Sequence, residues 1–202
     1  MAKRVMKPGN MLYPVPAALV SARGKDGRSN LLTIAWCGTV CSDPPMLYVS
    51  VRKSRYTYDM IRESGCFVVN LTTEALARAT DLCGVISGRD VNKWEKAGLT
   101  EAPASVVDAP LVVESPVNIE CKVTEVKELG SHDMFLAEVV AVEADEAYFD
   151  EKGRFDMDRC GLIAYSHGEY RTLGKLLGTF GYSVKKDSKK RGGKPAAKSG
   201  KK

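Results

Sequence analysis

Apolar residues gather in short runs through the first half of the chain, and these runs have the length of β-strands. The pattern predicts strands at residues 17–22, 31–41, 46–51 and 66–71, each bounded by turn-forming Gly, Pro, Asp or Asn. The run at 66–71, CFVVNL, is almost continuously apolar, which predicts a strand buried on both faces.

Two long alternating stretches dominate the second half. Residues 117–129 and 134–149 alternate along most of their length, and GSHD lies between them. This arrangement predicts two long strands joined as a hairpin. A further stretch from residue 162 begins as a strand and becomes glycine-rich and irregular.

The predicted helices are few and short. Ser54 is placed to cap a helix over 56–64, which the next glycine closes. A second helix is expected over 72–84, with a threonine cap and Gly84 as its stop, and a short third one after Asp90. Many strands with a few short helices predict a mainly β fold, built as one antiparallel β-barrel domain.

Composition narrows the class of protein. The chain has 202 residues and is 44% hydrophobic, as expected for a globular domain. No apolar run approaches the roughly 20 residues of a membrane span, and the N-terminus lacks a cleavage site, so we expect a cytoplasmic protein without membrane insertion. Six cysteines form no C-x-x-C pair and no histidine stands at ligand spacing, which predicts reduced core thiols and no metal site.

Charge divides the chain in two. Residues 185–202 hold nine Lys or Arg and one Asp, so residues 1–184 have a net charge of −3 against +5 for the whole chain. A mildly acidic body argues against a nucleic-acid groove within the fold. The basic tail has too little apolar surface to fold. We expect one domain over 1–184 and a disordered, solubilising tail, with weak contacts to RNA or anionic membrane as the alternative.

The stretch YVSVRKSRYT combines a strand end with bases and hydroxyls. Arg52 offers a planar fork and Lys53 a mobile charge, both suited to phosphate oxygens. Ser54 and Thr57 add hydroxyl donors near a helix start, where the helix dipole favours an anion. The pattern indicates either a phosphate site or a solvated turn.

Two further stretches suggest a planar, anionic ligand. Trp36 lies between the small residues Ala35 and Cys37. Its ring therefore either contacts a planar ligand or packs in the core. The glycine-containing loop around Arg89 and Lys93 carries two basic side chains, which could bind an anion. The chain has no dinucleotide fingerprint, P-loop, G-x-S-x-G or H-E-x-x-H motif. This combination favours a cofactor that performs its own chemistry.

Taken in order, these stretches resemble the flavin reductase-like proteins with an FMN-binding split β-barrel. The resemblance covers roughly residues 10–183, and CGVISGRDVNKWEKAGLT and GEYRTLGKLLGTFGYS are most similar to the flavoredoxin branch. It implies an antiparallel split β-barrel with a few short helices. It also implies a homodimer with FMN at the subunit interface.

The resemblance assigns site residues as well. It implies that Ala35–Cys37 lines the isoalloxazine ring and that the segment Ser50–Lys53 lines the phosphate. The full set of FMN-binding residues that we expect is Asn30, Ala35, Trp36, Cys37, Ser50, Val51, Arg52, Lys53, Ser54, Thr57, Lys93, His132 and Tyr165.

The activity implied is that of an FMN-binding oxidoreductase or electron carrier. NADH, NADPH or a reduced protein partner would deliver electrons, and the flavin would pass them to an acceptor. The alternative is a non-catalytic module that binds or stores FMN. The two hypotheses differ in whether a face of the flavin ring stays accessible.

Overall fold

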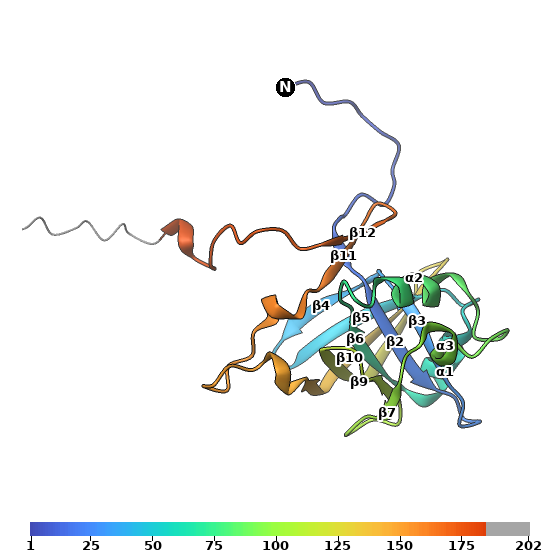
Figure 1. Cartoon of the computed structure of the whole chain (residues 1–202). Coiled ribbons are helices and arrows are strands. Elements are labelled where there is room, and N and C mark those ends of the chain that lie inside the picture. Colours follow the sequence, from blue (N-terminus) through green and yellow to red (C-terminus); the bar gives the residue numbers. More distant parts are fainter. Residues whose placement is uncertain (185–202) are drawn as a thin grey trace, which may run out of the picture.

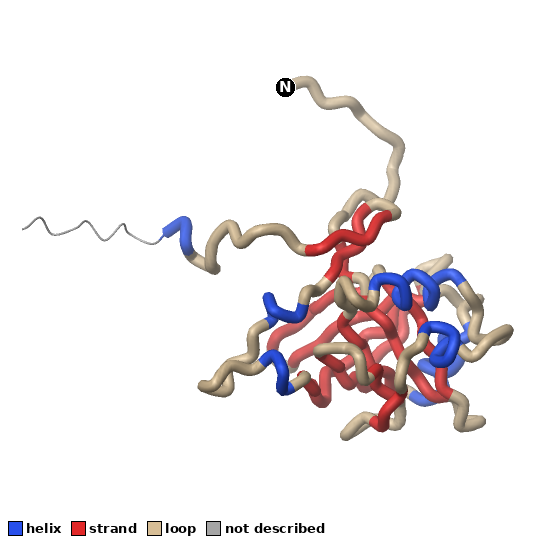
Figure 2. Tube along the Cα trace, in the orientation of Figure 1, coloured by secondary structure: helices blue, strands red, loops and turns tan. Residues whose placement is uncertain are grey.

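The structure, a computed structural model, describes residues 1–184, and the predicted disordered tail at 185–202 lies outside the described residues. The fold is mainly β, with short helices packed on the outside of one large curved sheet (Figures 1 and 2). No helix within residues 1–184 has the length and apolar character needed to cross a membrane.

The large sheet has seven strands, and every neighbouring pair is antiparallel. The expected strand at 31–41 is two strands, because the chain bends at Ala35 and Trp36. In spatial order the strands are β3 (Ser29–Ile34), β2 (Ala18–Arg23), β6 (Cys66–Leu71), β9 (Val117–Glu128), β10 (Asp133–Ala144), β5 (Pro45–Val51) and β4 (Cys37–Ser42).

The bend between β3 and β4 curls this sheet. These strands are its two edges, yet only Ala35 and Trp36 separate them in sequence. The edges must therefore approach each other at one end, while they are not hydrogen-bonded along their length. The Ser50 backbone N–H donates to the Trp36 carbonyl at 2.8 Å and fixes the bend against β5. The predicted antiparallel split barrel is confirmed.

The barrel interior is an apolar core to which alternate residues of each strand contribute. Phe67 and Val69 of β6 point inward with Val20, Val49 and Phe135. Cys66 and Val68 of the same strand join a second cluster on the outer face. The continuous apolar pattern of β6 therefore reflects burial on both faces, as the sequence predicted.

The helices differ from the prediction at their starts. α1 (Tyr56–Ser64) has Arg55 at its N-cap without a side-chain cap bond, so Ser54 is not the cap. Gly65 closes α1 in the left-handed conformation, as expected. α2 (Ala77–Val85) begins later than residue 72, because Thr72 donates its hydroxyl to the Ala17 carbonyl and keeps that segment on the sheet.

The end of α2 also differs, since Gly84 lies inside the helix and does not stop it. The third predicted helix is α3 (Lys93–Ala97), capped by the Asn92 side chain. The hairpin between β9 and β10 is confirmed, but β10 ends at Ala144. The chain beyond it turns into a 3-10 helix at Glu146–Tyr148.

A small sheet of β1, β11 and β12 lies beside the barrel (Figure 1). The segments outside it, 1–12 and 173–184, extend away from the barrel. The remaining elements are β1 (Val15–Pro16), β7 (Glu101–Pro103), β8 (Pro110–Val112), β11 (Ile163–Ser166), β12 (Glu169–Thr172) and the 3-10 helices Met157–Cys160 and Tyr182–Val184.

Candidate functional site

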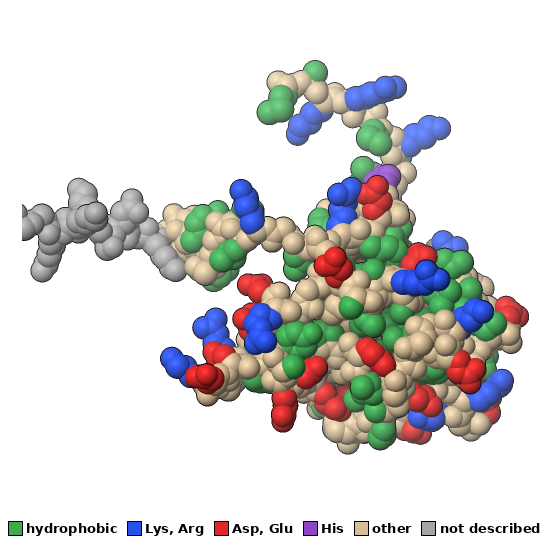
Figure 3. Space-filling model, viewed as in Figure 1, with side chains coloured by type: hydrophobic (Ala, Val, Ile, Leu, Met, Phe, Trp, Pro, Cys, Tyr) green, Lys and Arg blue, Asp and Glu red, His purple; other side chains and the backbone are tan. Residues whose placement is uncertain are grey.

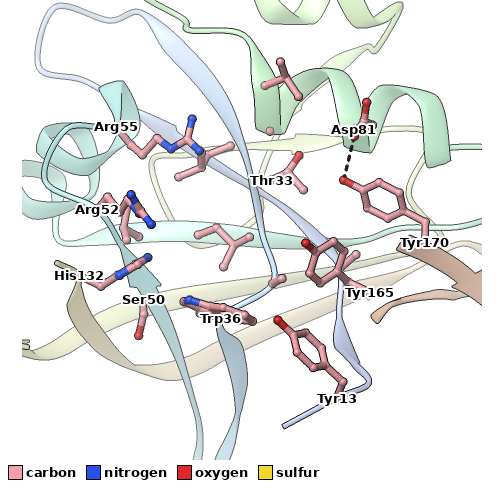
Figure 4. A pocket seen from close by; sticks show the side chains of 17 residues that line it. Tyr13, Thr33, Trp36, Ser50, Arg52, Arg55, Asp81, His132, Tyr165 and Tyr170 are labelled. Carbon is pink, nitrogen blue, oxygen red and sulfur yellow. Dashed lines mark hydrogen bonds between the residues drawn. The ribbon is translucent and has the colours of Figure 1, made fainter. Parts of the chain in front are cut away.

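A cavity of about 390 Å³ opens where β3 bends into β4, and we call it the junction cavity. Figure 4 shows Arg52, Arg55 and His132 at one end of it and three tyrosines at the other, with Trp36 between them. Its lining residues are Tyr13, Ala17, Leu32, Thr33, Ile34, Ala35, Trp36, Ser50, Val51, Arg52, Arg55, Asp81, Gly84, Val85, His132, Tyr165 and Tyr170.

The aromatic end is assembled from segments far apart in the sequence. The Tyr13 ring centroid lies 6.2 Å from that of Trp36 and 6.1 Å from that of Tyr165. The Tyr170 and Tyr165 rings meet edge to face, with their centroids 5.7 Å apart. The Tyr170 hydroxyl donates to Asp81 Oδ1 at 3.3 Å. Burial, with Asp81 adding to it, raises the pKa of Tyr170 to about 12, so its hydroxyl keeps its proton. These rings offer flat apolar surface suited to a planar ligand.

The basic end carries positive charge. Burial and the nearby Arg52 and Arg55 guanidiniums lower the pKa of His132. Each of these effects disfavours the imidazolium, so His132 is a neutral ring at physiological pH. Positive charge at this end therefore comes from the two arginines.

A second cavity of about 200 Å³ adjoins the first, and we call it the anion cavity. Leu32, Arg52 and Arg55 line both cavities. No carboxylate lines the anion cavity, so its cations face a ligand unopposed. Its lining residues are Asn30, Leu32, Arg52, Ser54, Arg55, Tyr56, Thr57, Ile86, Ser87, Gly88 and Lys93.

Lys93 is a buried cation in the anion cavity, with only 3% of its surface exposed. Its ammonium donates to the carbonyls of Leu31 at 2.9 Å and Cys83 at 2.7 Å. Within residues 1–184 no carboxylate lies within ion-pair distance of it. Burial lowers the pKa of Lys93 to about 8. An ammonium has three donors, so one N–H remains for an anionic ligand.

Another part of the anion cavity's lining is also fixed by hydrogen bonds and close packing. Asn30 and Thr57 are buried, and the Asn30 amide donates to the Thr57 hydroxyl at 2.7 Å. A Cβ at Gly88 would lie 2.2 Å from Asn30 Oδ1. A side chain at this position would collide with the Asn30 amide, so glycine allows the 86–88 loop to approach this pair closely.

The structure brings together most of the residues that the sequence singled out. Ala35, Trp36, Ser50, Val51, Arg52, His132 and Tyr165 line the junction cavity. Asn30, Arg52, Ser54, Thr57 and Lys93 line the anion cavity.

Two of the predicted residues line neither cavity. Lys53 forms ion pairs with Glu128 at 3.2 Å and Asp133 at 3.5 Å. Cys37 faces the barrel core, and burial raises the pKa of its thiol to about 11.

Several lining residues were missed by the sequence reasoning. Arg55 belongs to the basic stretch and lies directly before α1. Its position at a helix start, where an anion is favoured, could have identified it. Tyr13 and Tyr170 gave no local signal, since only the β1–β11–β12 sheet brings them to Trp36. The role of Gly88 could not be recognised from the sequence, because it depends on the close approach to Asn30 in the folded structure.

The two cavities together fit a flat heteroaromatic group with an anionic tail. The spare Lys93 donor and the arginines could hold a phosphate beside the closely packed Gly88. The junction cavity adds an aromatic wall next to backbone at Ala35 and Trp36. An FMN molecule has both of these parts.

The chain is similar to known proteins along most of its length. The flavin reductase like domain matches residues 10–174. The flavoredoxin of Desulfovibrio vulgaris (Miyazaki F) is 33% identical, with a TM-score of 0.84 over 91% of this chain and 100% of that chain. The flavoredoxin from Methanosarcina acetivorans is 31% identical, with a TM-score of 0.81 over the same shares. FMN reductase (NADH) RutF of Pseudomonas syringae pv. syringae is 29% identical over 61% of this chain and 67% of that protein.

Proposed function

The chain belongs to the flavin reductase-like family, and on that premise we propose that it is an FMN-binding oxidoreductase of the flavoredoxin type. The observation that carries the proposal is the junction of two cavities of different character. One has a buried cation with a spare donor and no opposing carboxylate. The other is flat-walled and aromatic. FMN requires this pairing of a phosphate site and a ring site.

Lys93, Arg52, Arg55 and Thr57 would hold the phosphate in the anion cavity. Trp36 and the backbone beside it would line the isoalloxazine ring, which supplies the redox chemistry when bound. The neutral His132 lines the basic end of the junction cavity. Its Nδ1 is hydrogen-bonded to Ser131, so its Nε2 would donate or accept one hydrogen bond with a ligand. Tyr13 and Tyr165 would cover part of the bound ring at the aromatic end of the junction cavity.

NADH or NADPH is the electron donor that we propose, with a reduced protein partner as the alternative. The similarity to a protein that is an FMN reductase (NADH) supports a nicotinamide donor. All six cysteines are free thiols, which supports a reducing cytoplasmic setting.

We further propose that the protein is a homodimer. Segment 173–184 extends from the barrel and exposes Leu176, Leu177 and Phe180, the last of them completely. Figure 3 shows hydrophobic side chains along this segment. A second copy of the chain would cover such apolar surface. Sedimentation of the purified chain measures its oligomeric state.

The function is tested by an absorbance spectrum of the purified protein and an anaerobic titration with NADH and NADPH. We expect a yellow protein that releases FMN on denaturation and whose flavin absorbance bleaches on titration. A colourless protein that takes up no FMN would contradict the proposal. Bound FMN that no nicotinamide or reduced redox protein can bleach would favour the storage module instead.

A further inference from the structure

The Lys93 amine is held at one place in the wall of the anion cavity. Leu31 and Cys83 accept its hydrogen bonds at 2.9 and 2.7 Å. Leu31 lies on the edge strand β3, and Cys83 lies in the last turn of α2, where helix carbonyls lack backbone donors. The carbon stem and these two bonds take three of the four tetrahedral positions around Nζ. The fourth position is free to face the cavity that Lys93 lines.

This arrangement suits a neutral amine as well as an ammonium. A neutral amine keeps two N–H groups, which the two carbonyls satisfy, and carries its lone pair at the fourth position. Burial, with a smaller effect of Arg55, lowers the pKa of Lys93 to about 8, and the Cys83 thiol acts in the opposite direction. At about pH 7.5, roughly a quarter of Lys93 is therefore neutral, against about one part in a thousand of an ordinary lysine. A desolvated amine beside a cation is an activated nucleophile.

The other residues of the anion cavity select the electrophile. Arg52 and Arg55 line it, and within residues 1–184 no carboxylate does, so a reagent that binds there is an anion. The Thr57 hydroxyl accepts from Asn30 at 2.7 Å and keeps its own O–H for the same anion. Lys93 also lines a neighbouring cavity of about 500 Å³, which leaves room for a group attached to the anion. A small acyl phosphate has both parts, a phosphate for the arginines and a reactive carbonyl next to it.

We propose that Lys93 is a modification site, at which a small acyl phosphate held by Arg52 and Arg55 acylates the protein directly. The neutral Nζ attacks the carbonyl carbon and forms an N–C bond. The bond between that carbon and the bridging oxygen breaks, and its electron pair leaves with inorganic phosphate. The proton that Nζ loses passes to the phosphate, directly or through water, so no oxidant or reductant takes part.

Acylation changes the cavity in two ways. It removes the buried charge of Lys93, and it leaves one N–H for the two carbonyls of Leu31 and Cys83. The modified chain therefore binds FMN more weakly. The modification depends only on Lys93 and its cavity, whereas this consequence rests on the proposed function.

The test uses acetyl phosphate and the full-length chain freed of bound flavin. Mass spectrometry of peptides follows the acetylation of each lysine at about pH 7.5. Lys96 is the matched internal control, because it lies on the same helix α3 and is exposed. We expect Lys93 to react at least roughly tenfold faster than Lys96, because its neutral fraction is larger. Saturating FMN should protect Lys93 and leave Lys96 reactive.

Two variants and a second reagent separate binding of the phosphate from reactivity of the amine. Arg52→Ala should slow acetylation of Lys93 by acetyl phosphate about tenfold, as for loss of one charge-assisted contact. Lys53→Ala should not slow it, because Lys53 is paired with Glu128 and Asp133. Acetic anhydride is a small acetyl donor without charge, so Arg52→Ala should change its rate at Lys93 less than about threefold.

Acetylation of Lys93 by acetyl phosphate no faster than that of Lys96 would overturn the inference. Equal slowing of both reagents by Arg52→Ala would overturn it as well, since the arginine would then act on the amine and not on the phosphate. A chain that binds FMN but has an unreactive Lys93 keeps the proposed function and loses the inference. A chain that is acetylated at Lys93 but binds no FMN gives the reverse result.

Discussion

The two ends of the proposed flavin site are built in different ways. At the phosphate end, Lys93, Asn30 and Thr57 are almost fully buried and are held by hydrogen bonds within the barrel and its helices. At the ring end, Tyr13 and Tyr165 are half-exposed and meet through ring contacts. They come from the small β1–β11–β12 sheet beside the barrel and the segment leading into it.

This difference assigns different tasks to the two ends. The Lys93 side chain is already held in place, so little free energy is spent on ordering it when the phosphate binds. The phosphate end should therefore determine most of the affinity for FMN. The ring end is half-exposed and is built from ring contacts, so it should tune access to the flavin and its electronic properties. Changes at the phosphate end should thus separate FMN from riboflavin, which has no phosphate. Changes at the ring end should affect both ligands alike.

The largest effect is expected for Lys93→Met. The variant keeps a long apolar stem but loses the charge and the donors, so FMN affinity should fall roughly a hundredfold, about the loss of a buried charged hydrogen bond. Fluorescence titration with FMN measures the loss. Riboflavin provides the control, because its affinity should change less than about threefold. Equal losses for both ligands would show that Lys93 supports the fold and does not contact the phosphate.

A second test separates Arg52 from its neighbour Lys53. Arg52 lines both cavities, whereas Lys53 is paired with Glu128 and Asp133. Arg52→Ala should weaken FMN about tenfold, and Lys53→Ala should leave FMN affinity within about twofold. The same titration on the two single variants decides this. A larger loss from Lys53→Ala would mean that its ion pairs break when FMN binds.

The pH dependence of FMN binding tests the same end. Burial lowers the pKa of Lys93 to about 8 in the free protein, and a bound phosphate must raise it again. Binding therefore takes up a proton above pH 8, and FMN affinity should fall roughly fivefold between pH 8 and 9. Riboflavin should show no such fall, and Lys93→Met should abolish it. A flat FMN profile in the parent would place the phosphate away from Lys93.

The fold could be predicted from the sequence because its signals are local. Alternation gave the strands, and the continuous run of β6 indicated burial on both faces. The break between β3 and β4 could not be seen, because Ala35 and Trp36 carry no turn signal and the bend is imposed by closure of the sheet against β5. The late start of α2 has a similar cause, since Thr72 bonds to Ala17, a residue distant in sequence.

The site, like the fold, was predictable only where its signals are local in sequence. The basic stretch pointed to an anion, but which of its bases face the cavity depends on the acidic neighbours of Lys53, which come from the β9–β10 hairpin. Lys93 could be suspected from its loop. That it is buried without a carboxylate, and so shifted in pKa, is a property of the packed structure alone.

The smallest effect is expected at the ring end, from Trp36→Phe. The backbone of residue 36 is held by the Ser50 hydrogen bond, and the side chain is only half-buried, so the bend should survive the change. The smaller ring loses contact area with Tyr13 and with a bound flavin. We expect FMN and riboflavin affinities to fall together, by about threefold, which is near the lower end of the 0.5–1.5 kcal/mol for one aromatic contact, with a shifted flavin absorption band. The melting temperature of the flavin-free protein controls for a packing role. A lowered melting temperature with parental affinity and spectrum would make Trp36 a core residue and leave the ring end to the tyrosines.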